Sequence, residues 1–147
     1  MKILLPILFI LILTSCSKEI PSDKLVERQG ITYEVNSQTP FTGSKVSYYE
    51  NGKLNERVNY KNGKIEGLVE KYHENGQLSS KVKYKNRKVD GLVESYYENG
   101  QLKSRINLKD GELDGLSEDY YSNSQLERRV NYKNGKEDGL WEFYHEN

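Results

Sequence analysis

Cysteine, histidine and net charge are all scarce in this chain, and each scarcity excludes a class of protein or site. With one cysteine among 147 residues, no disulfide can form within the chain. The two histidines, His73 and His145, are far apart in the sequence, which favours structural roles over a metal site or an acid–base pair. The 22 basic and 22 acidic side chains balance and alternate, so nucleic acid is not an expected partner. We therefore expect no metal and no cofactor.

Long apolar runs are also scarce, and the one present lies at the start of the sequence. Ile3 to Leu13 follows Lys2 and ends at Leu13-Thr14-Ser15-Cys16. This run is short for a membrane span and has the layout of a secretory signal. Leu, two small residues and Cys resemble the lipobox of bacterial lipoproteins, in which the cysteine is lipidated and begins the mature chain. We expect a signal peptide at residues 1–15, palmitate-type lipid on Cys16 and a bacterial cell envelope location, periplasmic or surface. An ordinary signal peptide with an incidental cysteine is the alternative.

Two short segments lie between this cysteine and the main body of the chain. Residues 16–24 contain Pro21 and few apolar side chains, which predicts a flexible tether. Within residues 25–42, the segment from Val26 to Val35 predicts a hairpin that turns near Gln29-Gly30. We expect this hairpin to cap the exposed edge of the first repeat.

The region from Gly43 onward repeats with a period of 24 residues. Its copies open at five glycines, so residues 43–147 hold four and a half copies: Gly43, Gly67, Gly91, Gly115 and Gly139. A period of this size indicates one supersecondary unit stacked on copies of itself. Each copy has two turn signals, such as Asn51-Gly52 and Asn62-Gly63, and Asn-Gly between alternating segments is the strongest short-range hairpin signal. The unit is therefore a pair of antiparallel strands.

The strand register follows from the two connections within each copy. A two-residue turn at Asn99-Gly100 pairs Tyr97 with Leu102, and a four-residue loop from Asn86 to Val89 keeps the 24-residue register without slip. In this register one row of side chains, here called the valine row, is mostly apolar: Val69, Val82, Val93, Ile106, Ser117, Val130, Trp141. A row on the opposite face, the charge ladder, alternates in sign: Glu70, Lys81, Glu94, Arg105, Glu118, Arg129, Glu142. A further row places a large side chain opposite each strand glycine.

These rows predict an all-β fold, an elongated single-layer antiparallel meander of about ten strands. The face with the valine row is expected to carry a second apolar row: His73, Leu78, Tyr97, Leu102, Tyr121, Leu126. Between the two apolar rows lie Ser80, Ser95 and Ser104, so this face is interpreted as a shallow trough with a low floor. No helix is available in the repeats to cover it.

Trp141 and Phe143 are the exception to the repeat. They replace Val93 and Ser95 of the middle copy and bring two large aromatic side chains onto the trough face. They form either a cap over the end of the sheet or a binding hot spot, a role in which tryptophan is enriched. Their strand is expected to be an edge strand, which also permits self-association.

Two recurring segments of the sequence connect it to a known family. Tyr-Lys-Asn-Gly-Lys, followed two residues later by Gly-Leu, and Tyr-Tyr-Glu-Asn-Gly-Gln-Leu together resemble the MORN repeat variant family over residues 43–147. The chain departs from the pattern at Arg87 and Ser124, where turn glycines are expected, so looser turns are expected there. Bacterial chains of this kind are grouped as the YwqK-type antitoxin family, which implies a toxin as partner. The resemblance also implies a protein-interaction scaffold, or phospholipid binding, which the balanced charge disfavours.

The sequence as a whole favours a lipid-anchored binding module over an enzyme. No nucleophile–base pair is apparent, and each charged residue of the ladder has an evident cross-strand partner. The expected partner is a protein of unknown identity. Candidate binding residues are Ser80, Ser95, Ser104, Tyr97, Tyr121, Trp141 and Phe143.

Overall fold

Nearly all of the described chain is β-strand. The computed structural model describes residues 18–146. The repeats supply nine strands: β4 Gly43–Tyr48, β5 Leu54–Lys61, β6 Lys64–Tyr72, β7 Leu78–Lys85, β8 Lys88–Tyr96, β9 Leu102–Lys109, β10 Glu112–Tyr120, β11 Leu126–Lys133 and β12 Lys136–Phe143. Before them lie β1 Glu19–Pro21, the 3-10 turn η1 Ser22–Lys24, β2 Leu25–Arg28 and β3 Ile31–Glu34. The all-β prediction is confirmed.

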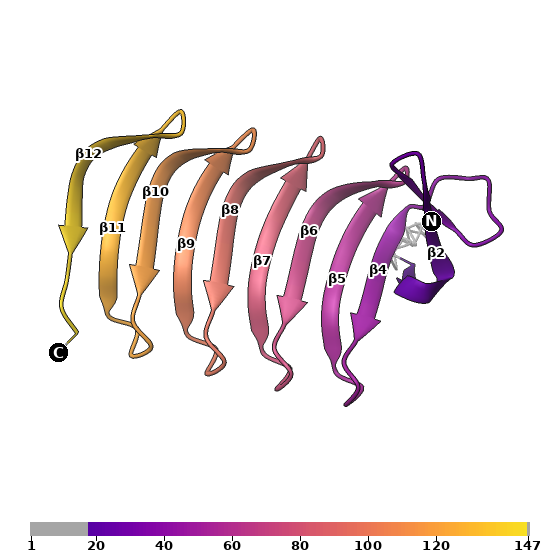
Figure 1. Ribbon diagram of the computed structural model, residues 1–147, viewed down its shortest axis with the longest axis horizontal. Coiled ribbons are helices and arrows are strands. Elements are labelled where there is room, and N and C mark those ends of the chain that lie inside the picture. The colour runs from indigo at the N-terminus through magenta and orange to yellow at the C-terminus, as the bar shows by residue number, and fades with distance from the viewer. Residues whose placement is uncertain (1–17, 147) are drawn as a thin grey trace, which may run out of the picture.

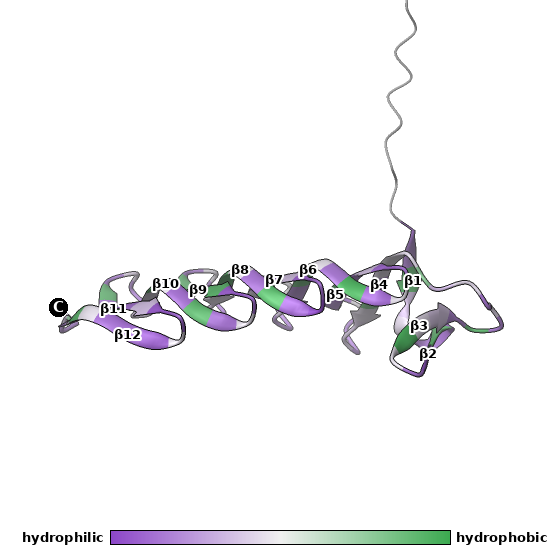
Figure 2. Ribbon diagram, turned by 90° about the horizontal axis from the view of Figure 1, so that it is seen from above, coloured by the Kyte–Doolittle hydropathy of each residue, from purple (hydrophilic) through white to green (hydrophobic). Residues whose placement is uncertain are grey.

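The repeats form one continuous sheet in chain order. Strands β4 to β12 pair antiparallel with their neighbours, and β1 adds to β4 in parallel as the tenth strand (Figure 1). Seen along its edge, this sheet is a single layer, and β2 and β3 lie out of its plane beside β4 (Figure 2). Both faces of the repeats are therefore uncovered over most of the length of the sheet.

The predicted 24-residue register is confirmed, but the connection behind it differs from the prediction. Val82 pairs with both Val69 and Val93, as expected. The connection between β7 and β8 is a two-residue turn rather than a four-residue loop, because Lys85 pairs with Lys88. A bulge in β8 then inserts the two residues that a two-residue turn leaves out, since Tyr84 pairs with Val89.

The bulge also explains the glycine that opens each copy. Gly91 has a φ of 115°, in the region that L side chains rarely adopt. It pairs with Leu108 on one side, as expected, but Tyr84 on the other side pairs with Val89. Glycine is thus needed here for the backbone of the bulge, and a large side chain covers it from one neighbouring strand.

The Asn99-Gly100 connection is longer than predicted. The amide of Tyr97 donates to the carbonyl of Gln101 and the amide of Gly100 to that of Tyr97, which makes a three-residue loop. A bulge at Lys103 restores the register, so Leu102 pairs with Tyr96 and not with Tyr97. Ser124 has a φ of 69° and donates the same turn hydrogen bond to Tyr121, so its turn is no looser than the others.

The segment before the repeats is more ordered than predicted. Glu19–Pro21 is strand β1 within the predicted tether, because Ile20 finds a buried position against β4 and is 6% exposed. The predicted hairpin forms with its turn at Gln29-Gly30, both with positive φ. The hairpin does not pair with the edge of the sheet, where β1 lies, but the amide of Thr32 donates to the carbonyl of Gly63.

The core of this sheet is small and lies mostly at its N-terminal end. The buried apolar side chains among the described residues are Ile20, Phe41, Val46, Val58 and Val130. Phe41 is 2% exposed, and its ring centroid lies 5.9 Å from that of Tyr60. The capping segments therefore provide much of the burial that a single layer lacks.

Candidate binding surface

The valine row and a row of small and charged residues share one face of the sheet. Ser80 pairs with Ser95, and Ser95 with Ser104, so the three predicted serines are adjacent. Ser95 Oγ and Ser104 Oγ lie 2.7 Å apart and share a hydrogen bond. Charges continue the row on either side, since Lys71 pairs with Ser80 and Asp119 with Ser104. The row is thus a low polar strip, as the trough interpretation requires.

The second apolar wall predicted for this face is absent among the described residues. Leu102 pairs with Tyr96, whose hydroxyl donates to Glu94 on the opposite face, and Leu78 and Leu126 pair with Tyr72 and Tyr120 in the same way. The bulge at Lys103 is the cause, because an added residue changes which positions face each other. The predicted trough is therefore an open face with one apolar row.

The tyrosines of the predicted wall connect successive hairpins instead. Tyr97 Oη donates to the carbonyl of Tyr120 at 2.8 Å, and Tyr121 Oη to that of Tyr144 at 2.9 Å. His73 Nε2 lies 2.9 Å from the carbonyl of Tyr96 in the same arrangement. Each bond spans 23 residues, so these side chains join one hairpin to the next. Their role is structural, as is that of His73.

Trp141 and Phe143 lie together on the valine-row face at the β12 end. Trp141 pairs with Val130 and Phe143 with Arg128, and the two ring centroids are 6.1 Å apart. Trp141 is 48% exposed and Phe143 63% exposed. They form the aromatic surface patch of this face, and the interpretation of Trp141 as a buried cap is not supported by this exposure.

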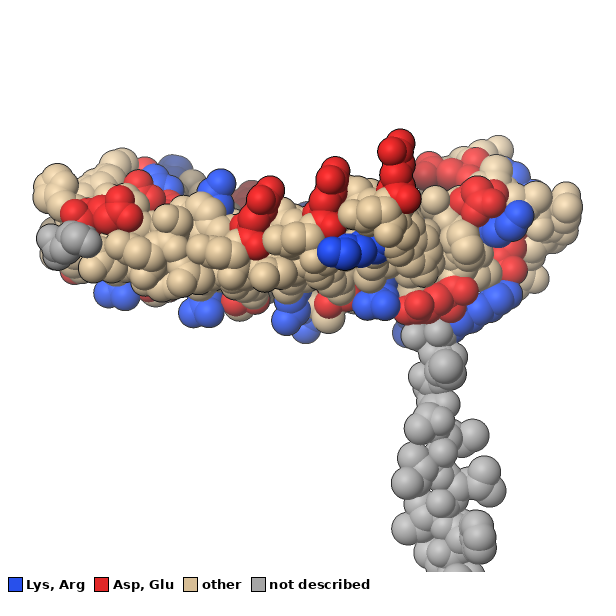
Figure 3. Space-filling model, turned by 90° about the horizontal axis from the view of Figure 1, so that it is seen from below, with Lys and Arg blue, Asp and Glu red and all other residues tan. Residues whose placement is uncertain are grey.

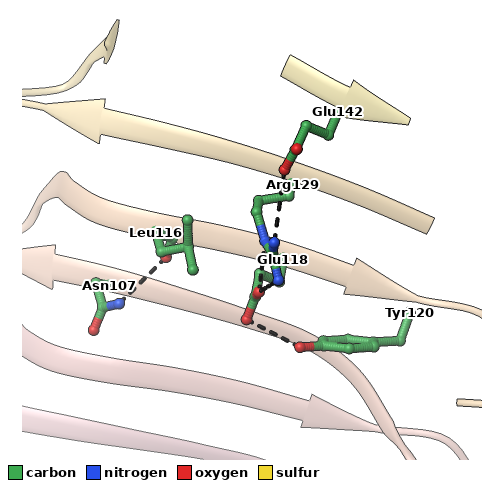
Figure 4. Close-up of polar contacts among 6 residues, drawn as sticks. All are labelled: Asn107, Leu116, Glu118, Tyr120, Arg129 and Glu142. Carbon is green, nitrogen blue, oxygen red and sulfur yellow. Dashed lines mark hydrogen bonds and ion pairs between the residues drawn. The ribbon is translucent and has the colours of Figure 1, made fainter. Parts of the chain in front are cut away.

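The charge ladder occupies the opposite face with the predicted pairing. Glu118 accepts from Arg129 at 2.9 Å and from the hydroxyl of Tyr120 at 2.9 Å, and its side chain is 7% exposed (Figure 4). Arg129 also lies 3.6 Å from Glu142. Burial, and then the hydrogen bond to Glu118, raise the pKa of Tyr120 above its ordinary value. These groups satisfy one another, which is a structural role.

The ladder is uneven along its length. Arg105 reaches Glu94 at 3.3 Å, and Arg57 extends the row by reaching Glu70 at 3.5 Å. Lys81 lies in register between Glu70 and Glu94, yet within the described chain it comes within ion-pair distance of neither. The arginines therefore carry the contacts, in keeping with their longer, forked side chain.

Sequence reasoning missed the asparagines of the turns as connecting residues. Asn51, Asn75 and Asn99 each donate a side-chain hydrogen bond to a carbonyl 23 residues further on. Each also accepts, through Oδ1, from the amide two residues ahead. The period of 24 was the available signal, because any side chain that reaches the next hairpin must recur with it.

Arg87 was also misjudged, since it stands where the repeat has a turn glycine. It keeps a positive φ of 67°, and its Nη2 donates to the carbonyl of Gly30 at 2.9 Å. The substitution thus attaches the β2–β3 hairpin to the third hairpin of the array. The turn is held in place by this contact rather than loosened.

The described residues contain neither a metal site nor a membrane-spanning helix. Residues 18–146 hold no cluster of three or more His, Cys, Asp or Glu side chains suited to a metal ion. Within the same residues, no helix is long and apolar enough to cross a membrane. Cys16, the predicted lipidation site, lies outside the described residues.

Comparison with known proteins gives a family and nothing further. Four segments match the model of a protein family described as MORN repeat variant, at residues 41–62, 65–86, 89–110 and 113–134. The matched segments follow one another at intervals of 24 residues and together cover more than half of the chain. No curated protein and no solved structure matches the chain.

Proposed function

Because the chain belongs to the MORN repeat variant family, we propose that it is a non-enzymatic scaffold that binds another protein at the bacterial cell envelope. The single-layer sheet supports this proposal, because it offers side chains on both faces and holds them at fixed intervals. Repeat arrays of this kind use such extended surfaces for binding.

The valine-row face near β12 is the proposed contact surface. Its support is the pair Trp141 and Phe143, two large aromatic side chains that remain about half exposed or more. An aromatic side chain next to a polar strip matches the composition of interface cores and rims. Tyr97 and Tyr121 are committed to the next hairpin and are therefore not proposed as contacts.

Lipid on Cys16 is the proposed anchor, and the support for it is the lipobox-like sequence Leu13-Thr14-Ser15-Cys16. Cys16→Ala should abolish palmitate labelling and release the protein from the membrane fraction. Unchanged labelling and fractionation in this variant would contradict the anchor. An antitoxin role is the special case in which the captured partner is a toxin that acts in the envelope or arrives from outside.

Capture of a partner from envelope extract tests the contact surface. We expect Trp141→Ala to weaken capture about tenfold, or about 1.4 kcal/mol, while melting temperature falls only slightly. Tyr48→Ala is the matched control, because Tyr48 is 55% exposed and lies on the opposite face. If both variants capture equally well, or if Trp141→Ala unfolds at growth temperature, this surface is wrong.

A further inference from the structure

A hollow lies between the turns of the second and third hairpins, at the edge of the sheet opposite the Asn99-Gly100 type of turn (Figure 1). The turn residues of β5–β6 and β7–β8 line it: Lys61, Asn62, Lys64, Glu66, Asn86 and Arg87. A second hollow beneath the β2–β3 hairpin shares Lys64 and Arg87 and adds Tyr60 and Tyr84. We call the first the basic hollow.

The cations of the basic hollow lack acidic partners. Lys61 and Lys64 are directly opposite each other across the turn, an arrangement of like charges that destabilises a sheet. Neither lysine has an ion pair within residues 18–146, and the one contact of the Arg87 guanidinium there is the carbonyl of Gly30. Glu66 is already engaged, since its Oε2 accepts from the amide of Asn86 at 3.0 Å.

The equivalent hollow 48 residues further along shows that the fold does not require these cations. It is lined by Lys109, Asp110, Glu112, Asp114 and Asn134, so acids replace the positions of Asn62 and Lys64. The same side-chain bond supports it, because Asp114 Oδ2 accepts from the amide of Asn134 at 3.4 Å. One backbone frame thus carries opposite charge in two places, and the charge of the basic hollow needs another explanation.

We propose that the basic hollow binds a carboxylate of an acidic segment of the partner protein. Two lysines and the fork of Arg87 supply the charge and the donors that a carboxylate requires, and the side-chain amides of Asn62 and Asn86 supply further donors. A phosphate group carries about −1.5 to −2 charges and would be repelled more strongly by Glu27 and Glu66. This inference deepens the binding role proposed above and rests on it for the partner being a protein.

Fluorescence anisotropy with a labelled hexaglutamate peptide and the purified protein tests the proposal. Lys61→Gln with Lys64→Gln should weaken peptide binding about tenfold. Lys133→Gln with Lys136→Gln is the matched control, because these lysines face each other in the same turn two further hairpins along the array. The control should change the affinity by less than about twofold.

Three outcomes would overturn the proposal. The first is no binding by the wild type, and the second is an equal loss in the control pair, which would indicate unspecific charge attraction. The third is displacement of the peptide by inorganic phosphate at far lower concentration than by acetate at matched ionic strength. Capture through Trp141 is measured separately, so a peptide that fails to bind while capture persists sinks this proposal alone.

Discussion

The two ends of the sheet are built from similar strands but differ in burial. At the N-terminal end, β1 and the β2–β3 hairpin cover the first strands, and Phe41 and Val46 are each 2% exposed. At the other end every residue of β12 is exposed, and Leu140 is 88% exposed. In a single layer, burial comes only from neighbouring strands and from added segments, so sequence repetition alone does not produce a core.

Truncating a phenylalanine at each end should give the largest contrast. We expect Phe41→Ala to lower the free energy of unfolding by about 3–5 kcal/mol, because it empties a buried site against Tyr60. Phe143→Ala should cost well under half as much, since its side chain is 63% exposed. Urea denaturation followed by tryptophan fluorescence and circular dichroism measures both, and equal losses would show that the comparison is wrong.

The same glycine at two turns provides a second contrast. Gly63 and Gly135 have nearly the same φ, 72° and 74°, so alanine is strained at both. A Cβ at Gly63 would also clash with Ile31 and approach the carbonyl oxygen of Thr32 to 2.8 Å, whereas nothing lies within 4 Å of one at Gly135. Gly63→Ala should therefore cost about 1–3 kcal/mol more in thermal denaturation. Equal melting temperatures would mean that the hairpin does not pack on the sheet.

Two glutamates of the charge ladder sharpen the comparison further. Glu118→Ala leaves Arg129 and Tyr120 without a buried acceptor, so we expect a loss of about 1–3 kcal/mol. Glu142→Ala removes a side chain that is 46% exposed and should change stability by less than about 0.5 kcal/mol. Chemical denaturation measures both, and a larger loss from Glu142→Ala would overturn the order.

Alkaline pH should have the smallest effect. Burial, followed by the hydrogen bond to Glu94 and its charge, raises the pKa of Tyr96 in the folded state above the unfolded value of about 10. The stability from this group is complete below about pH 10 and is lost as pH rises through the higher folded-state pKa. Tyr96→Phe should flatten the fall of the urea midpoint between about pH 10 and 12 more than Tyr144→Phe, at the equivalent position near β12. Equal flattening in both would contradict the ladder as the cause.

The sequence was sufficient to predict rows that depend on the period, and insufficient where single residues break the alternation. The valine row and the charge ladder follow from the 24-residue offset, and Val82 lies between Val69 and Val93 as predicted. The bulge at Lys103 has no distinctive residue, so the face of Leu102 was assigned wrongly. In β8 the bulge has Gly91, but its φ of 115° is visible only in the folded chain.

Contacts outside the repeat were harder still to predict. Strand β1 has one buried apolar residue, Ile20, which gives no periodic pattern. Arg87 is recognisable as an interruption of the repeat, yet its bond to Gly30 spans 57 residues. The charges at the edge of the turns were visible in the sequence, but the hollow formed by Lys61, Lys64 and Arg87 was not. Figure 3, viewed from the opposite edge, shows acidic and basic side chains on different sides of the sheet.

The hydrogen bonds that join each turn to the next have a consequence for the evolution of length. Asn75 and His73 contact only the hairpin that follows, 23 residues on, so a hairpin is held by its neighbours and by nothing more distant. One copy could be duplicated or lost in the gene without a change in any other contact of the array. Since two strands span about 10 Å, such events would lengthen or shorten the protein as a ruler, in steps of that size.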